Sequence, residues 1–559
     1  GSTIKDQVDV VRAPTQGTSV TIQPGVMQSS LREGLAEWDR MKQVAIREGV
    51  NFLPGCAIKV QKLIPLVKKA VAKGFVSEAA ACQVELMFTK GSNLYCNYEA
   101  LESHLHTSRF FRNYKSATEN RHGVSKGIRK RVEAQQSYCL GPFSRGDLSL
   151  LPTKSLVFPL GGVQKKGENG VLLEEYRPAS DHTKSGFNMF SDPPSFSLTA
   201  TQDVARMFHV GFSMAVGDIQ NAFALIPLSP QIWKFMFFVW YNVFDANDTQ
   251  EYLYANLFAD FGSRGAPEAF RVLFVEVCVG IARCESVICP TREIPIHVDD
   301  FCVIDKSKVV ADQEMQTLML FFGELGIQFK NGNFAYANWL QTMLGFIWDS
   351  NTLTRQLTAA RRDQYIQDWK SHAVKKSISL RERQSDIGRL HRAILTLPPG
   401  SAVFMANILM AVRGLKLPWQ QRRVRKAEKS DLLAVSALLE ANMGRGYYDF
   451  SLLRRAPAVY TDASKSKSYT GGGYVSESGH YSFYQYASRA ARKPIDFLEG
   501  DTVLVALTDL ARLHSHSVVP VYIDNQAFQL SGLKGWSRAD RLNDVLLKIF
   551  HLAAKHDFV

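Results

Sequence analysis

The stretch Ile294-Pro295-Ile296-His297-Val298-Asp299-Asp300-Phe301-Cys302-Val303-Ile304 joins two apolar runs through a short polar turn that ends in two adjacent aspartates. This pattern predicts a β-hairpin with both carboxylates near its tip. Adjacent carboxylates repel each other unless a cation holds them, so their place at a tight turn indicates a metal site. Most Asp-Asp pairs are ordinary solvated turns, and the surroundings of this one must decide between the two interpretations.

A second apolar run, upstream of the hairpin, also ends in a carboxylate. It reads Val216-Gly217-Asp218-Ile219-Gln220-Asn221-Ala222-Phe223. Two strand-end carboxylate sites are what a two-metal nucleotidyl transferase requires. The run resembles motif A of reverse transcriptases, and His297 to Asp300 takes the place of the family's Tyr-x-Asp-Asp box, with histidine at the tyrosine position.

Three further segments resemble the same family and follow the family's order. They are the fingers motif Arg177-Pro178-Ala179-Ser180-Asp181 with Asn188, motif B at residues 261–270, and the primer grip Leu344-Gly345-Phe346. The resemblance implies that Asp218 and Asp299 bind two Mg²⁺ or Mn²⁺ ions, that Asp300 supports them, and that the Ile219 carbonyl completes the metal shell.

The resemblance also implies a set of nucleotide-binding residues. Phe223 would lie beneath the sugar and exclude a 2′-hydroxyl, although a core phenylalanine is the simpler interpretation. The glycine of motif B would permit close backbone approach, and a downstream lysine would act as general acid. The full set is Arg177, Lys165, Lys166, Phe223, Gly262 and Lys330.

A second carboxylate constellation lies near the C-terminus. Val459-Tyr460-Thr461-Asp462-Ala463-Ser464, a triple glycine at 471–473, Glu499 and Val521-Tyr522-Ile523-Asp524-Asn525 together resemble a ribonuclease H domain. The resemblance implies that Asp462, Glu499 and Asp524 bind two more metal ions and cut the RNA of RNA–DNA hybrids. The family adds a fourth aspartate beyond its fifth strand, and we expect the chain to stop at the start of that strand, so the sequence leaves nuclease activity open.

Most of the net charge of +13 lies in one segment. Residues 355–430 hold 17 Lys and Arg against 5 Asp and Glu, interleaved with helical apolar positions. A solvated helix face is one interpretation, but the segment follows the primer grip, where a polymerase thumb holds duplex backbone. The predicted nucleic-acid contacts are Arg361, Arg362, Arg389, Arg392, Arg422, Arg423, Arg425 and Lys426.

Composition fits a large intracellular enzyme of the cytoplasm or nucleus. The chain has 559 residues, of which 46% are hydrophobic, and no uncharged apolar run long enough for a membrane span. The eight cysteines lack the spacing of a zinc site, and buried reduced thiols are the expected interpretation.

These observations predict an α+β and α/β multidomain chain, a right-hand polymerase followed by a ribonuclease H-like α/β domain. The expected units are a flexible arm (1–30), a mostly helical extension (31–150), fingers and palm (151–350), thumb (351–430), connection (431–456) and an incomplete ribonuclease H-like domain (457–559).

The closest resemblance is to DIRS-like, tyrosine-recombinase retrotransposons, with gypsy-type and pararetroviral enzymes next. Expected partners are RNA and DNA template-primer, RNA–DNA hybrid and dNTPs. The alternative is a domesticated, catalytically weak fold that serves as an RNA-binding scaffold. An RNA-synthesising viral polymerase is disfavoured by Phe223 and by the nuclease-like domain.

Overall fold

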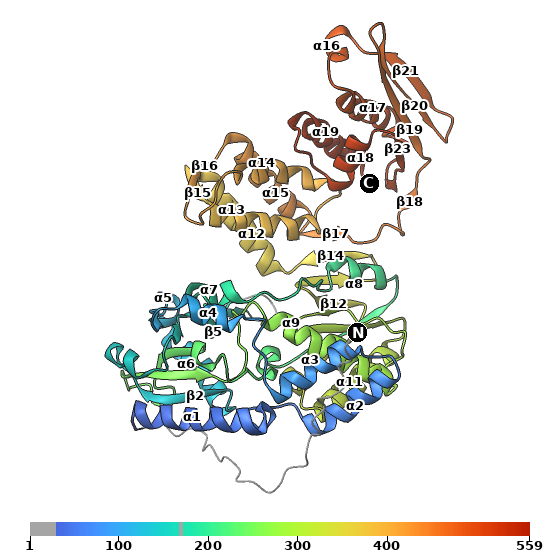
Figure 1. Cartoon of the computed structure of the whole chain (residues 1–559). Helices are drawn as coiled ribbons and strands as arrows, with labels where there is room; N and C mark the ends of the chain where they lie inside the picture. The colour runs from blue at the N-terminus through green and yellow to red at the C-terminus, as the bar shows by residue number, and fades with distance from the viewer. Residues whose placement is uncertain (1–28, 167–171) are drawn as a thin grey trace, which may run out of the picture.

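The computed structural model describes residues 29–166 and 172–559. Figure 1 shows a broad lower body built from the N-terminal helices and several sheets, with a helical cluster above it on one side and the C-terminal domain above it on the other. The predicted fold class is confirmed as a chain of several domains that mix helix and strand. The names fingers, palm and thumb are kept for the segments to which the sequence analysis gave them. Of the predicted arm, residues 1–28 lie outside the described residues.

Residues 31–150 are mostly helical, as predicted. The helices are α1 (Leu31–Glu48), α2 (Val60–Ala72), α3 (Glu78–Thr89), α4 (Tyr98–His104), α5 (Lys115–Thr118) and α6 (Arg121–Glu133). The segment is not a separate unit, because it supplies two strands to the five-stranded fingers sheet, and α1 packs on one of them. The sheet order is β1 (Arg109–Phe110), β3 (Leu156–Phe158), β7 (Phe237–Tyr241), β8 (Glu251–Asn256) and β2 (Ser137–Pro142).

A separate hairpin completes the fingers. It pairs β4 (Leu160–Lys166) with β5 (Leu172–Ser180), and α6 packs against β5. Residues 167–171, which join these strands, lie outside the described residues.

The palm sheet lies between two apolar cores. Its order is β11 (Ala335–Asn338), β6 (Ser213–Asp218), β10 (Asp300–Asp305) and β9 (Ile296–His297). Phe301 and Val303 of β10 face one core, and Cys302 and Ile304 face the other. Burial on both faces explains why this strand is an uninterrupted apolar run. One face is covered by α11 (Lys308–Glu324) and by a helix that runs through α9 (Ala266–Arg271), a π-helical segment (Val272–Cys278) and α10 (Val279–Cys284).

The thumb stands on a second four-stranded sheet. That sheet has the order β12 (Leu340–Met343), β13 (Phe346–Asp349), β14 (Thr354–Leu357) and β17 (Arg445–Tyr447). The thumb contains α12 (Ala359–Val374), α13 (Leu380–Ile394), α14 (Ala406–Ala411), α15 (Lys426–Ala441) and the short pair β15 (Ser377–Ser379) and β16 (Gln421–Arg423). Because α15 packs along α12, the helical body continues past residue 430, where the sequence predicted a connection.

The C-terminal domain is one sheet covered by helices. Its order is β21 (Tyr481–Gln485), β20 (Thr470–Ser476), β19 (Val459–Lys465) and β23 (Val521–Ile523). Strands β19 and β23 are parallel, and α17 (Ile495–Leu510) packs on the sheet with α19 (Asp540–His556) beside it. Phe558 forms an isolated parallel bridge with Ser517 of β22 (Ser517–Val518).

No helix in the described part of the chain is long and apolar enough to cross a membrane. All eight cysteines are free thiols, and five of them are buried as expected, whereas Cys56 is half-buried and Cys82 and Cys289 are exposed.

Candidate active sites

The predicted carboxylates of the palm lie together at one end of the strands of its sheet. Asp218 ends β6 and Asp300 begins β10, and the two are register partners in the antiparallel ladder. Asp299 lies in the turn just before Asp300, and its carbonyl accepts a hydrogen bond from the Ile219 amide at 2.9 Å. Side chains far apart in the sequence therefore meet where each strand ends.

The turn that carries Asp299 is held in an unusual conformation. His297 pairs with Asp300, which leaves Val298 and Asp299 as the two turn residues. Val298 has a φ of 60°, which is strained for a β-branched residue. The His297 ring Nδ1 lies 2.9 Å from the Thr199 carbonyl oxygen, which anchors the turn to the segment before α8 (Thr201–Met207). Histidine at the family's tyrosine position therefore has a local structural partner.

The palm carboxylates destabilise one another's charged forms. Burial, followed by the charges of Asp299 and Asp218, raises the pKa of Asp300 to about 7. Burial and the charge of Asp218 also raise the pKa of Asp299, against the opposing charges of Arg177 and Lys330. Lys330 donates a hydrogen bond to Asp218 Oδ2 at 2.8 Å. Carboxylate oxygens that repel one another at the ends of two strands are suitable ligands for a divalent cation such as Mg²⁺.

Two of the predicted nucleotide-binding residues, Arg177 and Phe223, meet at the ring of Phe261 in motif B. The Arg177 guanidinium lies over the Phe261 ring, 4.3 Å from its centroid. Phe261 lies edge-on to Phe223 at 5.0 Å between centroids, and Phe223 also contacts Phe270. Phe223 is 8% exposed, so the same ring serves the core and the site. Motif A, motif B and the fingers are thereby joined through one aromatic stack.

The motif B loop is held against the end of β5. Gly262 has a φ of +118°, and a Cβ there would lie 1.7 Å from the Ser180 carbonyl oxygen. The Asn188 side chain donates to the Gly262 carbonyl at 2.9 Å and accepts from the Arg264 amide at 3.0 Å. The glycine is therefore required by close backbone approach, as the resemblance implied.

A buried polar network beneath this loop was not foreseen from the sequence. Asp260 lies 2.8 Å from His182 Nε2, accepts from the Asn256 side chain at 2.7 Å, and also accepts from the Ser180 hydroxyl. Burial alone would raise the pKa of Asp260, but His182 and Arg131 hold it below its ordinary value. The network joins fingers to palm directly before motif B. The only signal of this network in the sequence is that polar residues lie in or next to the fingers motif and motif B.

Of the two predicted fingers lysines, only Lys165 has a side chain that the structure describes. Lys165 donates to Glu175 across the hairpin at 2.8 Å, so part of its charge is already compensated. The Lys166 side chain lies outside the described residues. Their contact with nucleotide stays a prediction.

Two of the predicted nucleic-acid ligands hold the primer-grip turn. Leu344 and Gly345 form the β12–β13 turn, with φ of 53° and 76°. Arg361 donates to the Gly345 carbonyl at 3.2 Å and Arg392 donates to the Leu344 carbonyl at 3.0 Å. A Cβ at Gly345 would lie 1.6 Å from the Arg361 Nη1. These arginines hold the turn in place through its backbone carbonyls.

The other thumb cations divide into paired and unpaired groups. Arg389 pairs with Asp368 at 2.9 Å and Arg362 pairs with Asp363 at 2.8 Å. Buried Arg383, a further basic residue of the segment, pairs with Glu428 at 2.8 Å and serves the thumb core. The remaining predicted ligands form no ion pair in the described part of the chain. They are Arg422, Arg423, Arg425 and Lys426.

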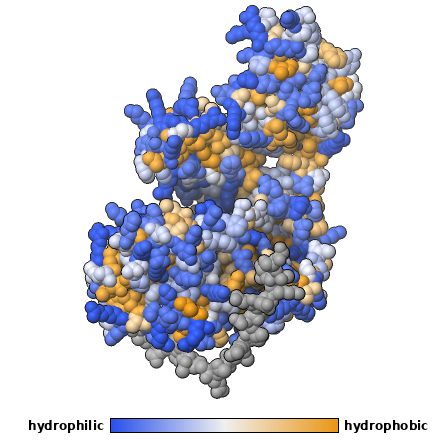
Figure 2. Space-filling model, viewed as in Figure 1, coloured by the Kyte–Doolittle hydropathy of each residue, from blue (hydrophilic) through white to orange (hydrophobic). Residues whose placement is uncertain are grey.

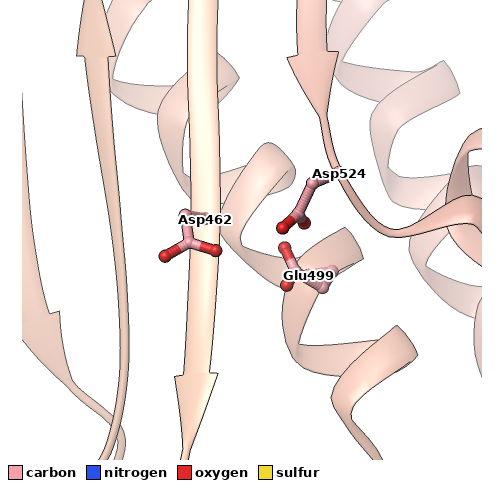
Figure 3. A group of neighbouring side chains, drawn as sticks. All are labelled: Asp462, Glu499 and Asp524. Carbon is pink, nitrogen blue, oxygen red and sulfur yellow. The ribbon is translucent and has the colours of Figure 1, made fainter.

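The C-terminal carboxylates converge more tightly. Because Thr461 of β19 is the register partner of Ile523 of β23, Asp462 and Asp524 follow at the same level of neighbouring strands. Ligand oxygens of these two residues and of Glu499 on α17 lie within 4.8 Å of one another. Figure 3 shows Glu499 and Asp524 pointing toward each other, with one Asp462 oxygen turned toward them. Within residues 29–166 and 172–559, this is the one group of three or more potential ligands that meets so closely.

Glu499 fits a role as a metal ligand. Its side chain is 3% exposed, and no hydrogen-bond partner for the buried Oε2 is found among the described residues. Burial, followed by the charges of Asp524 and Asp462, raises the pKa of Glu499 to about 7. A divalent cation would satisfy the free oxygen and relieve the repulsion at once.

Comparison with known proteins yields structural likeness only. No protein-family model and no curated protein sequence matches the chain. A solved structure of the foamy viral protease-reverse transcriptase dRH with double-stranded DNA is 13% identical, with a TM-score of 0.44, over 88% of this chain and 80% of that one. Structures of the foamy viral protease-reverse transcriptase are each 14% identical, with a TM-score of 0.42. The one with RNA/DNA hybrid covers 88% and 62% of the two chains, and the one with double-stranded DNA covers 90% and 97%.

Proposed function

We propose that this chain is a retroelement DNA polymerase that copies RNA and DNA templates and carries a ribonuclease H-like nuclease. The observation that supports the proposal most is the register pairing of Asp218 with Asp300, with Asp299 in the adjoining turn. The motif text favours the DIRS-like group. The partners that follow are template-primer, RNA–DNA hybrid and dNTPs, and the cofactors are two Mg²⁺ or Mn²⁺ ions at each site.

At the palm, Asp218, Asp299 and the Ile219 carbonyl would hold the two ions, with Asp300 in support. When bound, the ions would lower the pKa of the primer 3′-hydroxyl and stabilise the leaving pyrophosphate. Arg177, held over the Phe261 ring beside Asp299, has the charge to bind the triphosphate. Lys330, whose Nζ lies 2.8 Å from Asp218 Oδ2, would give the leaving group its proton.

Sugar selection would fall to Phe223. Its ring is wedged between Phe261 and Phe270 and is 8% exposed, so it has little freedom to move aside. A rigid ring beneath the sugar would clash with a 2′-hydroxyl and admit deoxynucleotides.

In the C-terminal domain, Asp462, Glu499 and Asp524 would hold the second pair of ions. When bound, those ions would activate water against the RNA strand of a hybrid. The unsatisfied Glu499 oxygen and the mutual repulsion of the three groups support this role.

Primer extension on an RNA template with dNTPs and Mg²⁺ or Mn²⁺ tests the polymerase. We expect Asp299→Asn to abolish extension and to leave cleavage of labelled RNA in a hybrid intact, and Asp524→Asn to do the reverse. Glu324→Gln, at the exposed end of palm helix α11, is the matched control and should match wild type in both assays. A wild-type chain that binds template-primer but never extends it would favour the scaffold alternative.

A further inference from the structure

A cleft opens in the fingers between α6 and the loop that joins β7 to β8. Its volume is about 550 Å³, and residues 242–244 and 246 of the loop form the wall that faces α6. Among the described residues, the lining has no acidic side chain and four basic ones, which are Arg121, His122, Lys126 and Arg129. Figure 1 shows α6 at the end of the lower body away from α11, and Figure 2 shows hydrophobic residues set among hydrophilic ones over that end. We name this space the fingers cleft.

The basic residues lie on one face of α6, and β5 packs on the other. Successive residues of an α-helix are about 100° apart, so the four basic positions fall within about 140° of arc. Gly123 and Gly127 face the opposite way, where a Cβ would lie 2.9 Å from the Tyr176 ring and 2.5 Å from the Pro178 ring, respectively. Because Tyr176 and Pro178 flank Arg177 in β5, the helix separates the fingers cleft from Arg177.

The positive charge of Lys126 is only partly compensated. Its Nζ lies 3.8 Å from Glu175, and that carboxylate is closer to Lys165, at 2.8 Å. Arg129 differs, because it pairs with Glu133 one turn along the helix at 2.7 Å. Lys126 therefore keeps charge that a ligand in the cleft can use.

Arg121 is held in place although it has no ion pair among the described residues. Its guanidinium lies over the Tyr241 ring, 4.0 Å from the centroid, and donates to the Asp248 carbonyl. Arg121 and His122 are in the first turn of α6, which holds no acidic residue. The helix dipole makes this end of the helix positive, so cations are unfavourable there. An anion in the cleft would offset this repulsion.

The loop wall is braced from within, so the cleft is formed before any ligand binds. The Asn242 side chain donates to Asp248 Oδ2 at 3.0 Å and accepts from the Phe244 amide at 2.9 Å. The Tyr252 hydroxyl also donates to Asp248 at 2.8 Å, so this carboxylate is used inside the loop. Phe244 packs against the fingers core, and the Arg129 guanidinium lies 5.2 Å from the centroid of its ring. The loop thereby offers an aromatic ring to the ligand.

The lining fits a ligand that combines phosphate with a planar ring. Guanidinium and ammonium groups bind phosphate oxygens, and an aromatic ring beside an arginine suits the face of a nucleic-acid base. The volume of about 550 Å³ lies within the range of about 300–1,000 Å³ that is usual for small-molecule sites. A phosphate ion alone would leave most of this space unfilled.

We propose that the fingers cleft binds a nucleoside diphosphate or triphosphate, with the phosphates on the basic wall and the base against Phe244. This site is distinct from the dNTP site of the proposed polymerase, because α6 lies between the cleft and Arg177.

Isothermal titration calorimetry of the full chain with ADP tests the proposal, in the presence of a chelator and without template-primer. We expect Lys126→Gln to weaken ADP binding about ten-fold, because one charged hydrogen bond to phosphate is lost. The matched control is Lys130→Gln, which removes an exposed lysine of the same helix that does not line the cleft and should bind ADP as wild type does. Phe244→Leu keeps an apolar side chain, so it should weaken ADP binding and leave the binding of inorganic pyrophosphate unchanged.

Hydrogen–deuterium exchange gives a second measurement. ADP should slow exchange in peptides that cover α6 and residues 242–250 of wild type, and should do so less in Lys126→Gln. Thermal denaturation of each variant shows whether it is folded. Primer extension is not used as a readout, so the fingers cleft and the polymerase function succeed or fail separately.

Three results would overturn the proposal. The first is that wild type does not bind ADP, or that Lys126→Gln binds it within about two-fold of wild type. The second is that Arg177→Gln, rather than Lys126→Gln, weakens ADP binding, which would place the ligand at the palm. The third is that single-stranded DNA binds with the expected Lys126 dependence and ADP does not, which would make the cleft part of a strand path.

Discussion

Replacing Glu499 with glutamine would remove a buried negative charge from the C-terminal carboxylate cluster and keep the size of the side chain. Glu499 lies within 4.8 Å of Asp462 and Asp524, and no partner for its Oε2 is found among the described residues. We expect Glu499→Gln to stabilise the metal-free domain at alkaline pH. We also expect it to abolish the stabilisation that divalent cations give to the wild type.

The magnitude follows from the pKa of Glu499, which burial and then the two aspartates raise from 4.5 to about 7. One pKa unit is worth about 1.4 kcal/mol, so holding the ionised side chain costs the folded domain about 3 kcal/mol. Between about pH 4.5 and pH 7, the folded state keeps a proton that the unfolded state has released. Stability is therefore fully present below that window, falls as the pH rises through it, and is constant above it. Glutamine carries no charge, so the stability of the Glu499→Gln variant does not fall in this pH range.

Hydrogen–deuterium exchange of peptides that cover β19 and α17 measures the effect locally. A difference of about 3 kcal/mol corresponds to about a hundred-fold change in the opening equilibrium, so the variant should exchange more slowly at pH 8 in the presence of a chelator. At pH 5 the two proteins should nearly coincide. Adding Mg²⁺ or Mn²⁺ at pH 8 should protect the wild type and leave the variant unchanged.

The control is Asp544→Asn, which removes an exposed carboxylate from α19 in the same domain and should leave exchange near β19 unaltered. Equal exchange of wild type and Glu499→Gln at pH 8 would show that the cluster carries no electrostatic strain. An equal response of both proteins to Mg²⁺ would show that Glu499 is not a ligand. Either result would refute the reasoning.

Three further predictions concern the polymerase half. Phe223→Val should raise the ratio of ribonucleotide to deoxynucleotide kcat/KM in primer extension, because it opens the space beneath the sugar, and unchanged selectivity would count against the assignment. Gly262→Ala should abolish extension, since its Cβ would lie 1.7 Å from a backbone oxygen, whereas Gly211→Ala, with open space around it, should cost only about 1 kcal/mol of stability by thermal denaturation. Asp260→Asn should lower unfolding stability in urea by about 3 kcal/mol, because it removes the buried negative charge that Arg131 faces, and a loss under 1 kcal/mol would contradict that role.

The strand ends were predictable from the sequence because the chemistry and the pattern coincide there. An apolar run that stops at Asp218 and another that starts at Asp300 predict two strands, and the observed register pairs these residues. In the C-terminal domain, Asp462 and Asp524 follow runs that proved to be parallel neighbours. In each case the hydrophobic pattern fixed the strand, and the strand fixed the position of the carboxylate.

The supporting contacts were not predictable, because they join residues whose types carry no periodic signal. Nothing in the sequence around Arg361 or Arg392 distinguishes an arginine that donates to a turn carbonyl from one that contacts phosphate. Likewise, the sequence predicted part of α15 to be a connection. Its packing on α12 joins segments that are far apart in the sequence, and local composition does not reveal such a contact. Local composition indicates which residues are buried or charged, whereas the partner that each residue contacts depends on the complete fold.

The two carboxylate centres solve one physical problem in different ways. At the palm, the acidic groups come from strands β6 and β10 and from the turn between β9 and β10, and Lys330 and Arg177 offset part of the repulsion. In the C-terminal domain, Glu499 approaches from a helix and is buried with an oxygen left unsatisfied. A centre offset by the chain's own cations should tolerate loss of metal better than one that is not. Removing all divalent ions with excess chelator should therefore increase hydrogen–deuterium exchange more in the region around α17 than in the region around β10, and exchange measured on the same sample compares the two directly.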